Sequence, residues 1–280
     1  MRFKERHYWA ALSLVLAAVG GLAARPVLAG ENLTIGGSGS TLGAMKILGV
    51  AFEKLNPGVT VVVLPSIGTT GGIKGVSAGV IDIGLAGRRL SDEEQKFGLD
   101  VTEFAATAVV LAIKADSSLS GLSKSELIGI LGGESIIGPH GQRLRPILRT
   151  AREPENIVAR RAFPELGAAI ERGPSRSDAV VALTAQEAAD LIERIPGAIG
   201  LSTLSLIRSE KRHMKALSID GVAPNATNVA SGAYPLVIGQ YLVTRPNPPE
   251  RIRRFIEFVR SEPGKRLLDE SGNYVGSQKR

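Results

Sequence analysis

Three glycine-bearing loops carry residue types that can hold an anion. They are Gly37-Ser38-Gly39-Ser40-Thr41, Ser66-Ile67-Gly68-Thr69-Thr70-Gly71-Gly72 and Asp82-Ile83-Gly84-Leu85-Ala86-Gly87-Arg88. Each follows an apolar run, and the first two lead into helix-like segments. Backbone N–H groups at the start of a helix lack intrahelical partners and carry the positive end of the helix dipole, so they bind phosphate-like groups. The nearby hydroxyls can add donors, and the loops therefore predict an oxyanion site.

Other interpretations of these glycines are weaker. Glycine also permits the tight strand-to-helix turns that any α/β sheet needs. The nucleotide signatures fail, because Gly37 and Gly39 are followed by glycine at position 43 rather than 42, and Lys74 lacks the following Ser or Thr of a P-loop. Three hydroxyl-rich loops at one end of a sheet favour binding over turn geometry alone.

The N-terminus has the pattern of a secretory signal. A basic start is followed by an apolar stretch from about Tyr8 to Ala24, and Val27 and Ala29 are the small residues of a cleavage site. We expect residues 1–29 to be a signal peptide, cleaved after Ala29, and the mature chain to be periplasmic or secreted. A retained membrane anchor is the alternative, because the apolar span is nearly long enough to cross a bilayer.

The composition narrows the classes of partner. The formal charge is +7, of which the leader contributes +3, so the mature chain carries +4. The chain has seven Phe, four Tyr and one Trp, and Trp9 lies in the leader, so aromatic platforms for stacking bases are scarce. A mildly basic exported protein suits a small acidic ligand, and no nucleic-acid partner is expected.

Catalytic and metal chemistry are disfavoured. A hydrolase would need a base for Ser38 or Ser40, and the chain beyond its leader offers His140 and His213. The stretch Gly36 to Ser40 also ends in serine where a nucleophile elbow needs glycine. Two separated histidines in a chain without cysteine do not suggest a transition-metal site. We therefore expect no enzyme activity, no cofactor and no metal.

Alternating strands and helices must position the loops. The periodicity predicts strands at 33–35, 59–64, 81–84 and 109–114, with helices at 42–55 and 73–78 and capping boxes at Ser91 and Ser123. A second block continues with strands at 145–148, 198–201 and 235–244 and helices at 127–131, 159–170, 185–195, 249–259 and 263–268. Two such blocks predict an α/β protein of two lobes, each a mainly parallel sheet flanked by helices. Ligands of such sheets bind at the carboxyl ends of strands, where the glycine loops lie.

With these motifs the chain resembles the phosphate-binding proteins of periplasmic ABC importers, which are type II, two-lobed solute-binding proteins. The matches include the first two glycine loops, Gly79 to Ala86 continuing to Arg89-Leu90-Ser91-Asp92-Glu93-Glu94, Pro196-Gly197-Ala198-Ile199-Gly200 and Tyr234-Pro235-Leu236-Val237. They follow the order and spacing of the family over almost the whole mature chain.

The resemblance implies a cleft between the lobes that closes on an unhydrated oxyanion. It implies lobe 1 at 30–112 and 236–280 and lobe 2 at 113–235, with crossing segments near Ile113 and Tyr234-Pro235. Thr41 would donate its hydroxyl and Leu42 its N–H, Thr69 would replace a ligand-binding serine, and Arg152 would open the ligand loop of the second lobe. The full candidate set is Ser40, Thr41, Leu42, Thr69, Thr70, Gly71, Gly87, Arg88, Arg152 and Asn156.

Two departures from the family pattern bear on the ligand. Phosphate binders of this family often have aspartate or serine where this chain has Gly87, and glycine cannot accept a hydrogen bond from a protonated phosphate oxygen. The usual Gly-Ser-Gly-Thr run of the second lobe is replaced by 154–158, which brings Glu153 and Glu155 near the expected anion. Asn156 can still donate through its amide.

These observations predict an exported, monomeric binding protein that captures phosphate or a related oxyanion and hands it to an ABC-type membrane permease. The alternative is a secreted sensor or scaffold that keeps the fold but binds another small molecule or a protein partner. A third class, a hydrolase of phosphate esters, would require turnover that depends on Ser40 and Thr41.

Overall fold

The structure is a computed structural model that describes residues 31–134, 136–138, 141–177 and 179–276. The expected signal peptide and its cleavage after Ala29 lie outside these residues. The strands are β1 (Glu31–Gly37), β2 (Val59–Val63), β3 (Ile83–Ala86), β4 (Asp100–Lys114), β5 (Gly121–Leu122), β6 (Ile136–Ile137), β7 (Arg143–Leu148), β8 (Val180–Val181), β9 (Ala198–Thr203), β10 (Met214–Ala216), β11 (Ser218–Ile219) and β12 (Val237–Thr244). The α-helices are α1 (Gly39–Leu55), α2 (Gly68–Ser77), α3 (Asp92–Gln95), α4 (Lys124–Leu131), α5 (Pro154–Ala162), α6 (Gly167–Arg172), α7 (Ala185–Arg194), α8 (Leu204–Ser209), α9 (Ala226–Ala230), α10 (Glu250–Arg260) and α11 (Glu262–Glu270).

Local sequence patterns account for several of the helices. In α1, Met45, Leu48 and Phe52 recur at helical spacing, and all three are buried. Ser91 and Ser123 start α3 and α4 with complete capping boxes, in which each serine and the glutamate three residues later satisfy each other's backbone N–H groups. Both capping predictions are confirmed.

One predicted helix is interrupted. The expected helix over 159–170 is instead the end of α5, a 3₁₀ turn at Pro164–Leu166, and α6. Pro164 lacks the N–H that a continuing helix needs, so α5 ends before it. Helix α5 also begins earlier than predicted, at Pro154, because proline is well suited to the first helical position.

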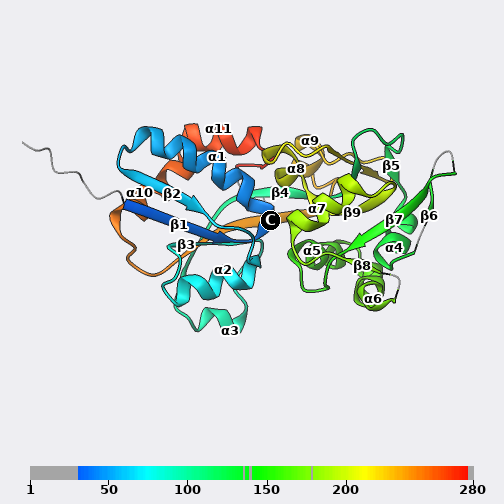
Figure 1. Ribbon diagram of the computed structural model, residues 1–280, viewed down its shortest axis with the longest axis horizontal. Helices are drawn as coiled ribbons and strands as arrows, with labels where there is room; N and C mark the ends of the chain where they lie inside the picture. The colour runs from blue at the N-terminus through cyan, green and yellow to red at the C-terminus, as the bar shows by residue number, and fades with distance from the viewer. Residues whose placement is uncertain (1–30, 135, 139–140, 178, 277–280) are drawn as a thin grey trace, which may run out of the picture. The chain divides into compact units, whose positions relative to one another are not determined.

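The sheet joins two sets of parallel strands through antiparallel crossing strands (Figure 1). In the first lobe, β1 pairs parallel with β2 and β3. In the second, β7 pairs parallel with β8 and β9. Strand β12 runs antiparallel to β3 and β4, and β4 runs antiparallel to β9. The two-lobed α/β fold is confirmed, and the crossing strands make its sheet mixed.

Strand β4 changes partners in the middle. Residues Asp100 to Ala108 pair with β12, whereas Val109 to Ile113 pair with β9. The predicted lobe limits, 30–112 with 236–280 and 113–235, stay a prediction. The exchange between Ala108 and Val109 lies a few residues before the crossing point expected near Ile113.

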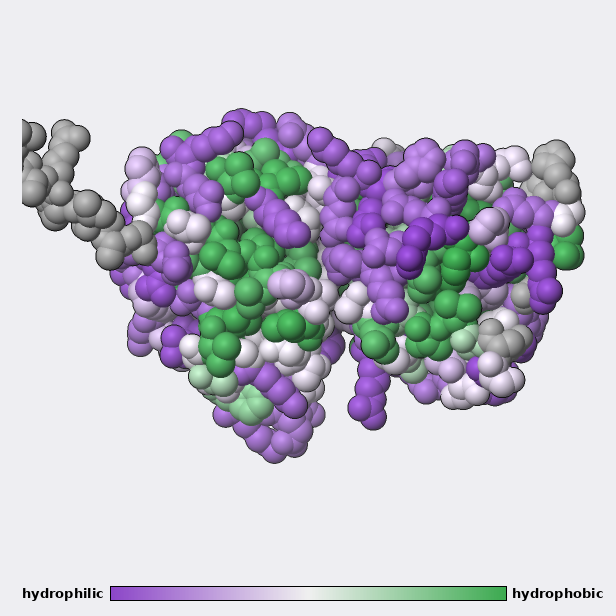
Figure 2. Space-filling view, viewed as in Figure 1, coloured by the Kyte–Doolittle hydropathy of each residue, from purple (hydrophilic) through white to green (hydrophobic). Residues whose placement is uncertain are grey.

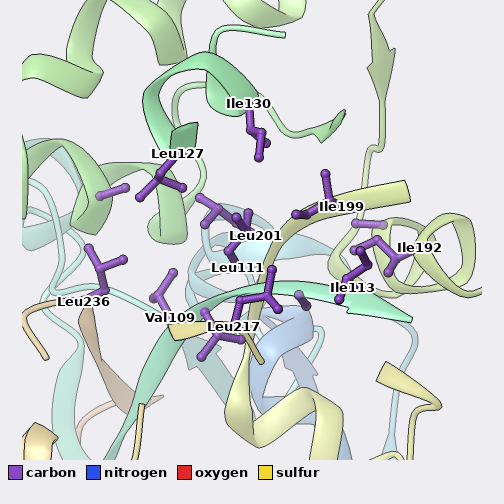
Figure 3. Packing of buried hydrophobic residues seen from close by; sticks show 14 of the residues in the cluster. Val109, Leu111, Ile113, Leu127, Ile130, Ile192, Ile199, Leu201, Leu217 and Leu236 are labelled. Carbon is purple, nitrogen blue, oxygen red and sulfur yellow. The ribbon is translucent and has the colours of Figure 1, made fainter. Parts of the chain in front are cut away.

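Each lobe has its own apolar core. The first-lobe cluster packs α1, β1 and β3 against α10 and includes Phe52, Leu85 and Phe255. The second-lobe cluster includes the buried side chains of β4 and β9. Figure 3 shows Val109 and Leu111 of β4 and Ile199 of β9 within this cluster. Separate cores let each lobe hold its own loops in place. In the part of the chain that the structure describes, no helix combines the length and apolarity needed to cross a bilayer.

Candidate functional site

The three glycine loops meet at the carboxyl ends of β1, β2 and β3. The N–H of Ser38 donates to the carbonyl of Leu85 at 2.9 Å, which joins the first loop to the third. The N–H of Ile67 donates to the carbonyl of Gly37 at 3.2 Å, and the N–H of Gly87 donates to Thr69 Oγ1 at 3.1 Å. Segments far apart in the sequence therefore form one cluster, as the sequence predicts.

Gly37 makes the closest approach in this cluster. Its φ of +147° lies in a region that side chains disfavour, and a Cβ atom added there would lie 2.2 Å from the carbonyl oxygen of Leu85. The glycine therefore lets the end of β1 touch β3 directly. This contact sets where α1 begins.

The start of α1 presents buried hydroxyls. Ser40 and Thr41 are at most 1% exposed, and Leu42 is buried beside them. Thr41 Oγ1 donates to the carbonyl of Ser38 at 2.8 Å, and the Oγ atoms of Ser38 and Ser40 lie 3.0 Å apart. The first backbone N–H groups of this 17-residue helix project from the same turn, which concentrates hydrogen-bond donors there.

The start of α2 contributes Thr69, Thr70 and Gly71. Thr69 is buried, and its Oγ1 accepts the N–H of Gly87, so its hydroxyl proton is left to donate elsewhere. Thr70 is exposed, and its Oγ1 accepts a hydrogen bond from Arg88. Gly71 is half-buried against Ile67. Thr69 is thus the hydroxyl of this helix that lies inside the cluster.

Arg88 is held by a carboxylate. Its guanidinium donates to both oxygens of Glu94, at 2.6 and 2.9 Å, in a half-buried ion pair. The hydrogen bond from Arg88 is the largest cause that lowers the pKa of Glu94 from 4.5 to about 2. Glu94 also completes the cap of α3 by accepting the N–H of Ser91. Arg88 therefore fastens α3 to the third loop, and its charge is largely compensated.

Replacing Glu94 by glutamine is expected to destabilise the protein by about 1–2 kcal/mol at neutral pH. A carboxyl whose pKa is lowered on folding stabilises the protein above its unfolded pKa, and that stability is lost as the pH falls from about 4.5 towards 2. Urea unfolding of both proteins across this range checks the prediction. A difference that does not shrink at acidic pH would contradict it.

The second lobe reaches this cluster through the start of α5. A Cβ atom added at Gly87 would lie 3.1 Å from Pro154 Cβ and 3.1 Å from Ile238 Cδ1. The third loop, the first turn of α5 and β12 are therefore in contact. In Figure 2, hydrophilic side chains predominate where the two lobes meet.

Arg152 and Asn156, the ligand residues predicted in the second lobe, differ in burial. Arg152 is exposed. Asn156 is buried, and its Nδ2 donates to the carbonyls of Arg149 and Thr150 at 3.0 and 2.8 Å. Both amide hydrogens of Asn156 thus hold the loop before α5. Their assignment as ligand residues stays a prediction.

Arg149, rather than Arg152, is the buried cation beside α5. It follows β7, its side chain is 9% exposed, and it forms an ion pair with Glu153. Arg149 and Glu155 also line a cavity of about 10 Å³, where Arg149 Nε and Glu155 Oε2 have no hydrogen-bond partner among the described residues. Burial raises the pKa of Glu153, and this outweighs the lowering effect of Arg149.

A groove of about 840 Å³ runs beside the cluster, between α1 of the first lobe and α7 and α8 of the second. Leu42 and Ser66 line it from the first lobe. Gln186 crosses from α7, where its Nε2 donates to the carbonyl of Gly39 at 2.8 Å and to Glu210 at 2.8 Å. The two lobes are therefore hydrogen-bonded to each other next to the buried hydroxyls of α1.

Histidines and clustered acidic side chains are the groups that could supply catalysis or bind a metal. His213 is exposed just before β10, and His140 lies outside the described residues. Among the residues that the structure describes, no group of three or more His, Cys, Asp or Glu side chains could hold a metal ion.

Comparison with known proteins places the chain in a family. The model of the PBP superfamily domain matches residues 24–263. Phosphate-binding protein PstS of Bacillus subtilis is 27% identical over 258 residues, which cover 88% of this chain and 81% of that protein. Among solved structures, a protein assigned as a phosphate ABC transporter substrate-binding protein, from Clostridium perfringens with bound phosphate, has a TM-score of 0.73 at 22% identity, over 88% of this chain and all of that one. An ABC-type phosphate transport receptor from Vibrio cholerae has a TM-score of 0.62 at 22% identity over the same shares. Because the family model spans most of the sequence and these structures share its two-lobed fold, the chain belongs to the PBP superfamily.

Proposed function

We propose that the protein captures phosphate or a related oxyanion between its lobes and delivers it to the permease of an ABC importer. The observation that carries the proposal is the meeting of three glycine loops with the start of α5 around buried hydroxyls. The helices α1, α2 and α5 all begin at this place, so their dipoles and free N–H groups favour an anion. The relatives named as phosphate-binding proteins support the same ligand.

The ligand would be held mainly by the first lobe. Ser40 and Leu42 of α1 and Thr69 of α2 supply hydroxyls and N–H groups from buried positions. The hydroxyl of Thr41 donates to the carbonyl of Ser38, so it would have to turn from that carbonyl to donate to the anion. Thr70, Gly71 and Arg88 shape the rim of the site. Closing the lobes over the anion would replace its water shell by these preset donors. We further propose that the mature protein is a monomer in the periplasm or outside the cell.

In the second lobe we propose Arg149 as the cation that faces the anion, ahead of Arg152 and Asn156. Its guanidinium is buried at the end of β7 and carries an Nε–H without a partner among the described residues. A bound oxyanion would have to share it with Glu153. Arg152 stays a candidate for the outer rim, because its side chain is exposed.

Calorimetric titration of the purified mature chain tests the proposal. Phosphate, sulfate, molybdate and phosphate esters are titrated separately, and binding of at least one is expected. No binding of any of these anions at millimolar concentration would defeat it. Turnover of a phosphate ester that disappears when Ser40 and Thr41 become alanine would instead favour a hydrolase.

Replacing Glu153 by glutamine is expected to raise sulfate affinity roughly three- to tenfold at neutral pH, because it removes a negative charge beside the proposed anion. In the unchanged protein, sulfate affinity should rise as the pH falls, since the raised pKa of Glu153 lets it become neutral at milder acidity than an ordinary glutamate. Sulfate titrations over a pH series check both effects. Glu165→Gln is the control, at an exposed carboxylate in the 3₁₀ turn after α5 that pairs with Lys124. An unchanged affinity in Glu153→Gln would place the anion elsewhere.

A second function is favoured by one observation. Pro154 of α5 lies against Gly87, and Arg149 is already paired with Glu153, so the second-lobe side of the site is occupied by the protein's own groups. A secreted sensor or scaffold that keeps the fold but binds a protein partner would fit this arrangement. The titration above separates the two functions, because such a protein would bind none of the four anion classes.

A further inference from the structure

Gln240 has a buried side-chain amide whose hydrogen-bonding groups are not used by the fold or by the site described above. It lies in β12, its side chain is 0% exposed, and neither Oε1 nor Nε2 has a hydrogen-bond partner among the described residues. A buried amide without partners costs stability, because it has given up its hydrogen bonds to water. Its neighbours in β12 are almost all apolar. Such a residue suggests a partner that arrives from solution.

The register of β12 places Gln240 beside the glycine of the third loop. Tyr241 pairs with Ala86, and Leu242 pairs with Leu85, in an antiparallel ladder. This ladder ends at the Tyr241–Ala86 pair, and the next residues along the two segments are Gln240 and Gly87. The pairing of β12 with β4 is irregular between Gln240 and Tyr241. On its other side Gln240 pairs with Ala105. Two small residues therefore flank the amide, and directly opposed side chains of a sheet lie within contact of each other.

Contacts of the adjacent residues show what this face of β12 meets. Ile238 lies two residues before Gln240, so both point to the same face. Ile238 Cδ1 lies 3.1 Å from a Cβ position at Gly87, and Pro154 of α5 lies at the same distance. On the other side of Gln240, Leu242 packs in one cluster with Leu42 of α1. Gln240 thus lies between Ile238, which approaches Gly87 of the third loop, and Leu242, which belongs to the apolar cluster that includes α1.

A side-chain amide supplies the hydrogen-bond acceptor that Gly87 lacks. Glycine cannot accept a hydrogen bond from a protonated anion, whereas an amide offers an acceptor at Oε1 and two donors at Nε2. We propose that Gln240 binds the oxyanion directly, with Nε2 donating to an ionised oxygen and Oε1 accepting the proton of hydrogen phosphate. Gln240 then sets the preference for protonated anions that the residue at position 87 cannot set. This inference rests on the proposed function.

A buried water is the competing explanation for the unpaired atoms. Ser205 is also 0% exposed with an unpartnered Oγ, and its N–H donates at 3.0 Å to Thr107, which pairs with Ile238. A water bridging Gln240 and Ser205 would make the amide part of the folded scaffold. The two explanations differ in stability. Removing a scaffold amide lowers the melting temperature, whereas removing a ligand-facing amide from the free protein does not.

The test uses Gln240→Leu, with Gln95→Leu as the matched control at an exposed glutamine of α3. Inorganic phosphate and sulfate are titrated calorimetrically against both variants and the unchanged protein, and each is melted without ligand. We expect the ratio of phosphate to sulfate affinity to fall roughly three- to tenfold in Gln240→Leu, because one neutral hydrogen bond to the phosphate proton is lost. Its melting temperature should stay equal or rise. Gln95→Leu should change neither quantity.

A second variant keeps the inference falsifiable if leucine perturbs packing. Gln240→Glu keeps the shape and the acceptor but replaces the donor by a charged oxygen. The ratio of phosphate to sulfate affinity should therefore rise in this variant. An unchanged ratio in both variants, with phosphate still bound, would overturn the role of Gln240 and leave the proposed function intact. A lowered melting temperature of Gln240→Leu with an unchanged ratio of phosphate to sulfate affinity would also overturn the role of Gln240. It would show that the amide stabilises the fold. Absence of oxyanion binding by the unchanged protein would overturn both proposals.

Discussion

Replacing Thr69 by valine is expected to weaken oxyanion binding by about 1.5–3 kcal/mol, or roughly ten- to a hundredfold. Thr69 is buried, and its Oγ1 accepts the N–H of Gly87 at 3.1 Å. That bond orients the hydroxyl so that its proton is free to donate to an anion. Valine keeps the shape but supplies neither the acceptor for Gly87 nor the donor for the ligand.

Thr69→Ser and Thr70→Val are the matched controls for this prediction. Serine keeps the hydroxyl and should retain most of the affinity. Thr70 is the adjacent residue, exposed and bonded to Arg88, so its replacement should change affinity little. Calorimetric titration with phosphate measures all three. Equal affinity in Thr69→Val and the unchanged protein would show that the second loop is only a turn.

Replacing Phe255 by alanine is expected to lower the free energy of unfolding by about 3–5 kcal/mol. Phe255 of α10 is 0% exposed, and its ring meets that of Phe52 of α1 edge to face, with centroids 5.2 Å apart. The ring of Phe258 also packs against Phe52, with centroids 5.7 Å apart. Truncation would remove the aromatic contact and leave a cavity between α1 and α10.

Urea unfolding of Phe255→Ala measures this loss, with Phe97→Ala as the control. Phe97 is 42% exposed, so its truncation should change stability by less than about 0.5 kcal/mol. A similar loss in both variants would mean that the α1–α10 contact does not carry the first-lobe core. Because α1 also begins the proposed site, weakened oxyanion binding is expected in Phe255→Ala near its unfolding midpoint.

Most individual elements could be predicted because their causes are local. The spacing of Met45, Leu48 and Phe52 is enough to specify a helix, and the serine–glutamate pairs at Ser91 and Ser123 specify two helix starts. The prediction was wrong where two local signals competed. The apolar pattern of 159–170 favours one helix, but Pro164 divides it.

The glycine loops and their hydroxyls were recognisable from residue type and position alone, because helix starts at strand ends bind anions by backbone geometry. The ion-pair partners of the charged residues could not be recognised from the sequence. Arg88 forms an ion pair with Glu94, Arg152 is exposed, and Arg149 is the buried cation. Sequence spacing cannot rank these three arginines, since their burial and ion pairing depend on how the chain folds back.

Gln240 is the clearest case of a residue that the linear pattern leaves undistinguished. A single amide in an apolar strand is visible in the sequence, but its place next to the end of the β12–β3 ladder, near Gly87, depends on the pairing of these strands. Strand pairing joins segments by hydrogen-bond register, and a slip of one residue would turn the amide to the other face. The sequence thus carries the local chemistry of the loops, whereas the long-range register of the sheet brings that chemistry to one place.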